Sequence, residues 1–395
     1  MATKIIIKRE SLVDAMKKIN GVFSQMQKKD SAVVVLQAAE LKKENAVAKA
    51  LTLTMFNGST QVAANIRCEA KSVIECPVTV PCGTELIAGV MALAGAAGDA
   101  YEVEVGDTAL VVKMGESSVT VCKKAEGIMP IDFDVKDKSC IEGRFILKAL
   151  DFRASAGSVL FAALNDDNTS TGGVAVVANE GTVIFRATDR RRIAEAKAEI
   201  KSAVFTGEDK SLSFVVSPAI LKMVMSGFSD GEMVFVKTTK HLTIQYGSDI
   251  WQIPLINHIY PHDLFVKIRA TKHNARVTFD KEEMQVALEI VSVAEAKDMI
   301  CKLNVEGGNL VIRDKGGSSK ATVKADVEGE FPEAIGFATK LLKSCVAAFK
   351  GDKITVAVSS AVMPSAFEAE GEEVYVGLCP VKLDVQPADE VNGEA

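Results

Sequence analysis

The residues able to carry out acid–base or metal chemistry in this sequence do not converge on one site. The four histidines are His241, His258, His262 and His273. His258 and His262 have the i, i+4 spacing of a metal-binding pair on a helix, but Pro261 between them disfavours a regular helix. The eight cysteines form no CxxC pair, which favours free thiols in a reducing compartment over a zinc site or disulfides. We therefore expect no metal and no cofactor.

Asp189, followed by Arg190, Arg191 and Arg192, is the group that most suggests a phosphate or nuclease site. A single carboxylate is too little to hold the metal ions of a nuclease. The chain also lacks the GxxxxGK[ST], GxSxG and HExxH motifs, which supply the phosphate-binding loop, nucleophile or zinc ligands of common enzyme classes. We therefore expect a protein that binds other molecules and is not an enzyme.

Length and composition indicate a soluble globular protein of two or three domains. The chain has 395 residues, of which 48% are apolar and 25% charged, with a net charge of -6. That charge argues against a surface that coats nucleic acid everywhere, but not against lysines gathered on one face. No apolar run reaches the ~20 residues of a membrane span, and the first residues lack the apolar region of a secretory signal. We expect a cytoplasmic protein without membrane contact.

The elements that must position these residues recur in three similar stretches of the chain. Each stretch combines two amphipathic helices with alternating strands. The second helices begin near Thr84, Pro218 and Phe337, about 120 to 135 residues apart, which is too long for a solenoid repeat and suits three copies of a domain. We place the domains at residues 1–138, 139–270 and 271–384, followed by a disordered acidic tail at 385–395.

Periodicity and turn signals give the expected elements. Ser11 is expected to cap the first helix, whose apolar face carries Leu12, Met16, Ile19 and Phe23. The other expected helices span 84–94, 147–163, 281–292 and 337–349, with one more beginning at Pro218 after Ser217. The expected strands span 101–105, 109–114, 118–122, 173–178, 182–187, 233–237, 242–246, 250–253, 276–279, 302–305, 310–313, 353–358, 366–369 and 374–378.

Residues 174–194, VAVVANEGTVIFRATDRRRIA, resemble the bacterial DNA polymerase III beta sliding clamp family. In that family two strands lead into Ala-Thr-Asp-Gly-His-Arg-Leu-Ala, so Arg190 and Arg191 replace Gly-His here. Tyr260-Pro261-His262-Asp263 resembles the family's Phe-Pro-Asp-Tyr with one residue inserted. Further similar segments follow in the same order and spacing, and together the similarity spans nearly the whole chain: Ile131-Asp132-Phe133, Ile335-Gly336-Phe337 and the closing strand Tyr375 to Leu383.

The resemblance implies an α+β fold of three tandem DNA-clamp domains, each with two helices packed on antiparallel sheets. Two chains would form a head-to-tail dimeric ring of six domains around double-stranded DNA. Such a ring slides without sequence specificity and tethers DNA polymerase, the clamp loader and other proteins with clamp-binding motifs. A clamp of two domains per chain would be shorter than 395 residues. A β-rich structural or assembly protein, of a phage or a cell surface, stays the alternative.

The resemblance also implies a hydrophobic cleft between the middle and last domains that receives a partner peptide. Thr171, Cys379 and Phe265 depart from the family pattern, so the partner motif can differ from the usual one. For Ile193, Leu378 and Val381 an ordinary place in the core is the alternative. The residues carried over to the cleft are Thr171, Thr188, Arg192, Ile193, Pro261, Val266, Leu378, Pro380 and Val381.

DNA binding by a sliding ring requires phosphate contacts from lysine and arginine and no base reading. The candidates on the expected helices are Lys17, Lys18, Lys28, Lys29, Lys148, Arg153, Lys222, Lys340 and Lys343, and for each a solvated helix face is the alternative. Residues 280–298 are acidic, so their helix either turns its acids outward or grips DNA loosely. The candidates for the dimer interface are Val119, Val121 and Val293, for which an intradomain core is the alternative.

Overall fold

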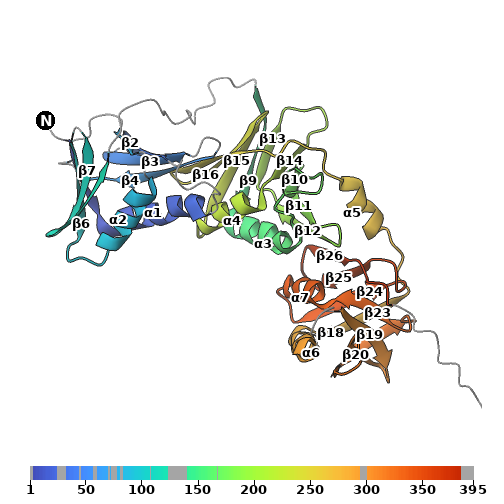
Figure 1. The fold of residues 1–395 in the computed structure, drawn as a ribbon. Helices are drawn as coiled ribbons and strands as arrows, with labels where there is room; N and C mark the ends of the chain where they lie inside the picture. Colours follow the sequence, from blue (N-terminus) through green and yellow to red (C-terminus); the bar gives the residue numbers. More distant parts are fainter. Residues whose placement is uncertain are drawn as a thin grey trace, which may run out of the picture. The chain divides into compact units, whose positions relative to one another are not determined.

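The computed structural model describes residues 3–24, 33–43, 46–56, 60–69, 72, 78–80, 83–106, 108–122, 140–166, 168–293 and 300–383. The chain divides into two compact units. Unit 1 comprises Met1–Ala154, Val176–Val183 and Ala198–Asn257, and unit 2 comprises Ser155–Ala175, Ile184–Lys197 and His258–Ala395. Figure 1 shows that both units combine helices with antiparallel sheets, which confirms the predicted α+β class.

Unit 1 begins with a strand that leads directly into the first helix. Its elements up to residue 122 are β1 (Thr3–Lys8), α1 (Arg9–Ser24), β2 (Val33–Lys43), β3 (Ala46–Phe56), β4 (Gln61–Arg67), β5 (Val78–Val80), α2 (Gly83–Leu93), β6 (Ala100–Val105), β7 (Ala109–Met114) and β8 (Ser117–Cys122). Its later elements are β9 (Ile141–Lys148), β13 (Ser202–Phe205), β14 (Leu212–Val216), α4 (Pro218–Ser226), β15 (Glu232–Thr238), β16 (His241–Tyr246) and β17 (Asp249–Pro254).

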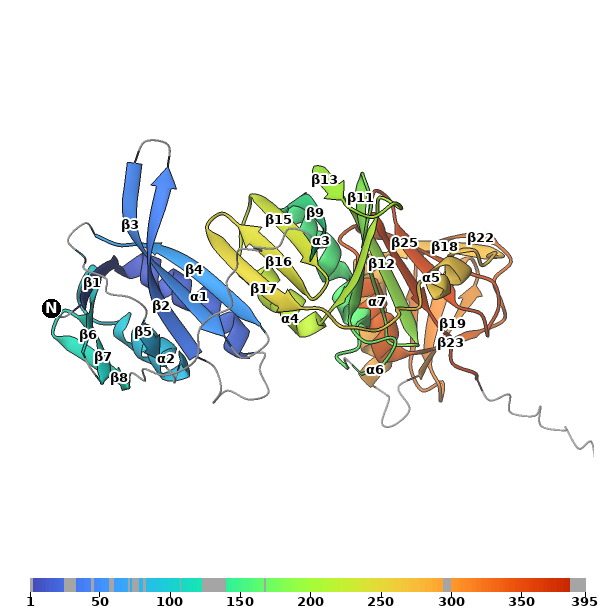
Figure 2. The same cartoon turned by 90° about the horizontal axis from the view of Figure 1, so that it is seen from above.

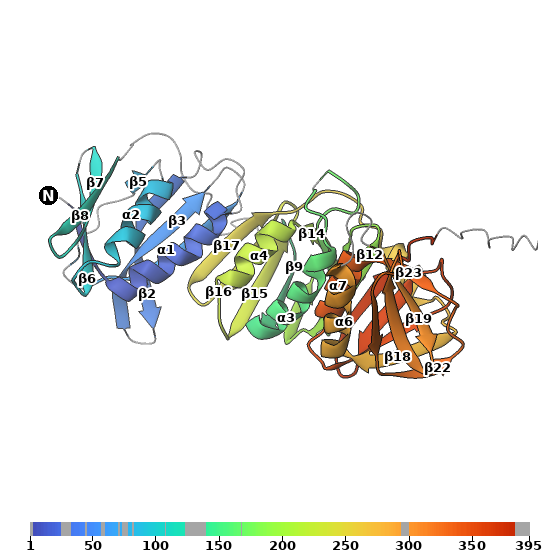
Figure 3. The same cartoon turned by 60° about the horizontal axis from the view of Figure 1, so that its bottom comes forward.

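Two sheets belong wholly to unit 1. One has the strand order β1-β6-β7-β8, and the other the order β13-β9-β15-β16-β17-β4-β3-β2-β5. Figure 2 shows the β2–β3 hairpin as the longest of this unit. Helices α1 and α2 pack against each other, and α1 also contacts β4 and α4, so the helices lie on one face of the strands (Figure 3).

Unit 2 contains the remaining helices and strands. They are η3 (Leu160–Ala162), α5 (His262–Arg269), β18 (Ala275–Asp280), α6 (Lys281–Val293), β19 (Ile300–Glu306), β20 (Asn309–Asp314), β21 (Lys320–Val323), β22 (Ala325–Gly329), β23 (Ile335–Ala338), α7 (Thr339–Ala347), β24 (Lys353–Val358), β25 (Ser365–Ala369) and β26 (Val374–Leu378). The boundary between the units runs through α3 (Ala149–Val159), β10 (Val174–Ala178), β11 (Thr182–Thr188) and β12 (Arg192–Glu199).

Two sheets organise unit 2, with helices α6 and α7 packed together beside them. One has the order β21-β20-β19-β23, and the other contains the run β11-β12-β26-β25-β24-β18-β22. The core between them is aliphatic and aromatic, with Phe279, Met284, Leu342, Phe349 and Phe367 buried together. Phe337 and Phe367 meet edge to face, with 6.5 Å between the ring centroids.

The same strand order occurs three times along the chain. One strand pairs with the first strand of an antiparallel three-stranded meander: β1 with β6-β7-β8, β9 with β15-β16-β17, and β18 with β24-β25-β26. The last strand of the second meander bonds to β4, and that of the third bonds to β12. The last strand of the first meander, β8, has no second neighbouring strand in the described part of the chain. Strand β21 ends the run β19-β20-β21, as β4 ends β2-β3-β4 and β12 ends β10-β11-β12. It too has no second neighbouring strand among the described residues.

Most expected elements are confirmed, and three expected boundaries are wrong. Ser11 lies inside α1, because the helix begins at Arg9 directly after β1. Leu147 belongs to β9, where it pairs with Met233. Phe337 belongs to β23, where it pairs with Cys301. For Leu147 and Phe337, pairing with a neighbouring strand moves the start of the helix to a later residue, whereas α1 starts earlier than expected. The helical face of Leu12, Met16 and Ile19 is buried as expected.

The turn after β20 is organised around a buried carboxylate. Asp314 accepts hydrogen bonds from the Gly316 N–H (3.0 Å), the Ser318 hydroxyl (3.1 Å) and the Ser319 hydroxyl (3.0 Å), as well as from the Ser319 N–H. Burial by itself would raise the pKa of Asp314, but the bonds from Ser319 and Ser318 outweigh it and lower the pKa to about 2.

No helix among the described residues is long and apolar enough to span a bilayer.

Candidate functional site

Two side chains hold the turn between β11 and β12, which carries the three consecutive arginines. The Thr188 hydroxyl donates to the Arg192 carbonyl (2.7 Å) and accepts the Arg190 N–H (3.1 Å). Asp189 Oδ1 accepts the N–H groups of Arg191 (3.0 Å) and Arg192 (2.7 Å), as short polar side chains do in tight turns. The turn forces Arg190 to a φ of 71°, in the left-handed region that non-glycine residues rarely adopt.

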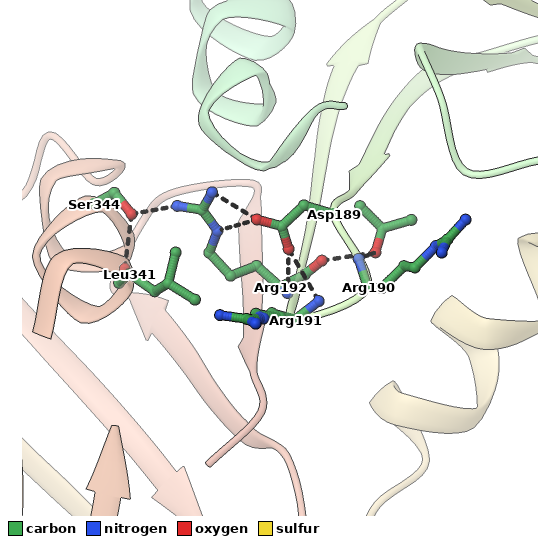
Figure 4. Close-up of polar contacts among 7 residues, drawn as sticks. Asp189, Arg190, Arg191, Arg192, Leu341 and Ser344 are labelled. Carbon is green, nitrogen blue, oxygen red and sulfur yellow. Dashed lines mark hydrogen bonds and ion pairs between the residues drawn. The ribbon is translucent and has the colours of Figure 1, made fainter. Parts of the chain in front are cut away.

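Arg192 is bound on all sides by its own chain. Its Nε and Nη2 contact Asp189 Oδ2 at 2.9 and 2.7 Å, and its Nη1 donates to the Ser344 hydroxyl of α7, as Figure 4 shows. Its guanidinium carbon lies over the Phe161 ring, 5.2 Å from the centroid. The side chain is only 12% exposed. Arg192 therefore ties the turn to α7 and has little surface left for another molecule.

Four of the predicted cleft residues lie in the interior below this turn. Arg192 stands opposite Leu378, and Ile193 opposite Gly377, in the β12–β26 ladder. Ile193, Leu378, Thr171 and Thr188 are buried. A Cβ atom at Gly377 would come within 2.8 Å of Ile193 Cγ1, so the two strands pack too closely for a side chain there. These residues therefore pack under the turn and are not themselves exposed.

The segment after β26 carries two further predicted residues, Pro380 and Val381. The Cys379 N–H donates to the Arg191 carbonyl (2.8 Å), and the Val381 N–H donates to the Gly336 carbonyl (2.8 Å). Pro380 and Val381 are half-buried. The structure thus fixes this segment between the arginine turn and β23.

Helix α5 contributes the exposed apolar surface of the site, and the sequence patterns did not indicate this helix. It begins at His262, directly after the half-buried Pro261. Phe265 is fully buried, whereas Val266 is 62% exposed, and Ile259, just before the helix, is 92% exposed. The helix spans only eight residues, too few for periodicity to distinguish it from a loop.

A buried carboxylate, which the sequence reasoning also missed, fixes α5 against β12. Glu195 Oε2 accepts Arg186 Nε at 2.7 Å, and Oε1 accepts Nη1 of Arg269, the last residue of α5. Arg186 also contacts His262 Nδ1 at 3.2 Å, at the start of the helix. Burial, with the Arg186 charge second, lowers the pKa of His262. Both ends of α5 are therefore held by one charged network, whose members lie 9 and 74 residues from Glu195.

The two histidines with i, i+4 spacing, His258 and His262, each contact another group of the chain. His258 Nε2 contacts the Gly172 carbonyl at 3.0 Å, and His262 contacts Arg186. In the described ranges no group of three or more His, Cys, Asp or Glu side chains could hold a metal ion.

The predicted DNA-facing residues divide into exposed and ion-paired ones. Lys18 pairs with Asp249 (2.7 Å) and Lys343 with Glu289 (3.0 Å). Lys28 and Lys29 lie outside the described residues. The exposed ones are Lys17, Lys148, Arg153, Lys222 and Lys340.

Arg153 has a structural role besides its exposure. Its Nη2 donates to the carbonyls of Met225 (3.1 Å) and Phe228, and its guanidinium lies over the Phe228 ring at 5.0 Å from the centroid. These contacts satisfy carbonyls at the end of α4, so substitution of Arg153 would disturb the helix end as well as any DNA contact.

Helix α6 presents acids and apolar side chains to solvent. Glu282, Glu283 and Glu289 are exposed to solvent. Val286, Ile290 and Val293 are also exposed at helical spacing, and Val293 is 88% exposed. We call these three residues the α6 stripe. The other acids of the predicted acidic helix, Glu295 and Asp298, lie outside the described residues.

The two valines of β8 differ from Val293. Val121 is buried and Val119 half-buried. A Cβ atom at Gly89 of α2 would lie 2.4 Å from Val119 Cγ1, so Val119 packs closely on that helix. Both valines therefore contribute to the packing of unit 1, while the backbone of β8 keeps one side without a strand neighbour within the described ranges.

Solved structures with the same fold are DNA polymerase III beta subunits, whereas no family model and no curated protein matches the sequence. A sliding clamp from Pseudomonas aeruginosa bound to griselimycin has a TM-score of 0.82 and 17% identity, over 97% of this chain and 100% of its own. The beta subunit from Thermotoga maritima has a TM-score of 0.79 and 16% identity, with the same coverage. The Helicobacter pylori beta clamp bound to a DNA ligase peptide has a TM-score of 0.77 and 16% identity, over 96% and 100%. The chain therefore has the fold of the beta sliding clamps.

Proposed function

We propose that this chain is a DNA sliding clamp, in which two copies join head to tail into a ring of six domains around duplex DNA. The ring holds DNA by enclosing it, slides without reading sequence, and tethers DNA polymerase and other partners. In this proposal each chain contributes three domains, at residues 1–138, 139–270 and 271–384.

The observation that carries the proposal is the pair of free strand edges. Within the chain, β17 bonds to β4 and β26 bonds to β12, so the last strand of one domain's meander joins the preceding domain each time. Strands β8 and β21 are the counterparts left without such a neighbour in the described residues. Pairing β21 of one copy with β8 of the next continues the series, and such a heterologous contact forms a ring when the rotation closes. It also covers edges that would otherwise promote aggregation.

The helices support the same interface between β21 of one copy and β8 of the next. Where β17 meets β4, helix α1 contacts α4, and Lys18 of α1 bonds to Asp249 of β17. By the repeat, α6 would meet α2 of the second copy. The α6 stripe is exposed in the single chain, and an apolar stripe rimmed by charges is typical of a surface that a partner covers. Val293 is then an interface residue, and β8, with Val119 and Val121, is the facing strand.

The enclosed DNA would be met by lysines on the helices. Lys17, Lys222 and Lys340 are exposed on α1, α4 and α7. Contacts of this kind neutralise phosphates, release counterions and carry no sequence information. A polymerase, a clamp loader and other clamp-binding proteins would bind at the surface formed by the arginine turn, α5 and the segment after β26. We call it the partner surface.

Retention on circular DNA tests the ring. The full chain is expected to sediment as a dimer, and to stay on nicked circular DNA while it leaves linear DNA of the same length from the ends. Ile290→Asp with Val293→Asp should give a folded monomer that is released from both DNAs, because both side chains are exposed and the charge penalises only a covered surface.

The matched control is Val204→Asp on β13, which adds a carboxylate at another exposed valine. It should leave the dimer intact. A monomeric wild-type chain, or equal retention on circular and linear DNA, would refute the proposal.

A further inference from the structure

We infer that the partner segment carries carboxylates next to its apolar anchor, an inference that rests on the proposed function of the partner surface. The source of the acidic preference is the arginine turn, whose Arg190 and Arg191 are exposed in the same unit as the exposed apolar residues of α5.

The turn holds more positive charge than its own carboxylate can balance. It has three guanidinium groups, from Arg190, Arg191 and Arg192, and one carboxylate, from Asp189. Asp189 is fully engaged: Oδ1 accepts two backbone N–H groups and Oδ2 binds the Arg192 side chain. The charges of Arg190 and Arg191 are therefore left for another molecule.

Arg190 is held in place while most of its hydrogen-bonding capacity stays open. Its φ of 71° is stabilised by the Thr188 hydroxyl, and its Nε donates to the Thr171 hydroxyl at 3.3 Å. The side chain is otherwise exposed. A guanidinium fixed at one N–H presents its remaining donors in a planar fork, which matches the two oxygens of a carboxylate.

Arg191 is exposed and makes no side-chain hydrogen bond or ion pair with any described residue. Its backbone carbonyl, by contrast, accepts the Cys379 N–H at 2.8 Å, so the residue is anchored to the segment that carries Pro380 and Val381. Figure 4 shows the Arg190 and Arg191 side chains pointing in different directions from the turn. Two separate cationic positions thus border the partner surface.

The rest of this surface adds a net positive charge. On helix α5 Asp263 and Lys267 balance each other, and Arg269 is paired with Glu195. Lys382 is exposed after β26. Exposed Val266 and Ile259 supply the apolar contact. A DNA strand would also match the charge, but the adjoining exposed apolar side chains favour a peptide whose anchor buries them.

Peptide binding to the full chain tests the inference. Two fluorescent peptides share the same Leu and Phe anchors and differ only in their flanks, which are Asp in one and Asn in the other. At low salt the Asp peptide should bind more tightly by roughly two- to fivefold for each ion pair formed. The advantage should shrink in 0.5 M salt, because a Debye length of ~4 Å screens exposed pairs.

The double variant Arg190→Gln with Arg191→Gln should bind both peptides alike. The control Lys210→Gln with Lys240→Gln removes the same charge from exposed lysines of unit 1 and should keep the preference for the Asp peptide.

Equal binding of the two peptides to the wild-type chain would overturn the inference, as would failure of both to bind. Reduced DNA retention of the arginine variant with unchanged peptide preference would assign the arginines to DNA and overturn it too. Retention on circular DNA by the wild-type chain is measured in parallel, so that failure of the clamp itself is distinguished from failure of this inference.

Discussion

Glu195→Ala should destabilise the chain by weakening the attachment of α5. Its cost in unfolding free energy should exceed that of removing an exposed ion pair. Glu195 is 2% exposed and Arg186 is 15% exposed, so Glu195→Ala leaves a guanidinium largely buried without its counter-charge. Breaking one partner of a buried pair costs about 3–5 kcal/mol. We expect the lower value, about 3 kcal/mol, because Arg186 keeps its contacts with His262 and with the Phe265 ring.

The contribution of Arg269 is smaller. Its side chain is 39% exposed, so solvent screens its attraction to Glu195 and supports the guanidinium after the carboxylate is removed. The matched control is Glu368→Ala: Glu368 pairs with Arg276 at 3.4 Å, and both side chains are about half exposed. Its removal should cost at most about 1 kcal/mol.

Urea unfolding followed by circular dichroism measures both free energies. The single tryptophan, Trp251, is buried in unit 1, so its fluorescence reports on that unit while the dichroism reports on the whole chain. Hydrogen exchange of peptides from α5 should accelerate in Glu195→Ala and stay unchanged in Glu368→Ala, because Glu195 binds Arg269 of the helix whereas Glu368 pairs with Arg276 of β18.

A double variant separates the charge from the packing. Glu195→Leu with Arg186→Met replaces the pair with apolar side chains and should be more stable than Glu195→Ala alone, because no unpaired charge stays buried. A destabilisation below about 1 kcal/mol for Glu195→Ala, or a double variant no more stable than the single one, would refute the reasoning.

Three further predictions concern other regions. The pKa of Asp314 is lowered to about 2 in the folded chain, compared with about 4 for an aspartate in an unfolded chain. The ionised carboxylate therefore stabilises the fold fully above pH ~4, and this stabilisation disappears as the pH falls through about 2. Asp314→Asn should therefore flatten the pH dependence of the unfolding free energy in that window, and an unchanged slope would contradict the prediction. Gly329→Ala should destabilise the protein by more than about 3 kcal/mol, since φ is 78° and the new Cβ would lie 2.1 Å from a backbone oxygen. Gly371→Ala, with φ 76° and open space around the new Cβ, should cost about 1–2 kcal/mol. Equal destabilisation of the two variants in thermal unfolding would show that the close approach at Gly329 is relieved. Lys17→Glu with Lys222→Glu should lower the log–log salt slope of DNA retention by roughly 0.9 for each phosphate that the chain no longer neutralises, and an unchanged slope would place both lysines away from DNA.

The sequence by itself determined the local elements. The spacing of Leu12, Met16 and Ile19 predicts the buried face of α1, and Ser217-Pro218 predicts the start of α4. Turn residues also separate the strands of the third meander, where 353–358 and 374–378 agree with the observed bounds. These features are readable because helix and strand periods, caps and turns depend on residues close together in the chain.

Only the tertiary structure decided which distant segments meet. Glu195 and Arg269 are 74 residues apart, and Gln252 of β17 pairs with Gln61 of β4 across 191 residues. No local pattern encodes such a pair, because it depends on the path of the whole chain between the partners. For the same reason, the sequence did not reveal that Arg192 is engaged with Ser344 while Arg190 and Arg191 stay open: three equal side chains in a row acquire different roles only when the turn and its neighbours are in place.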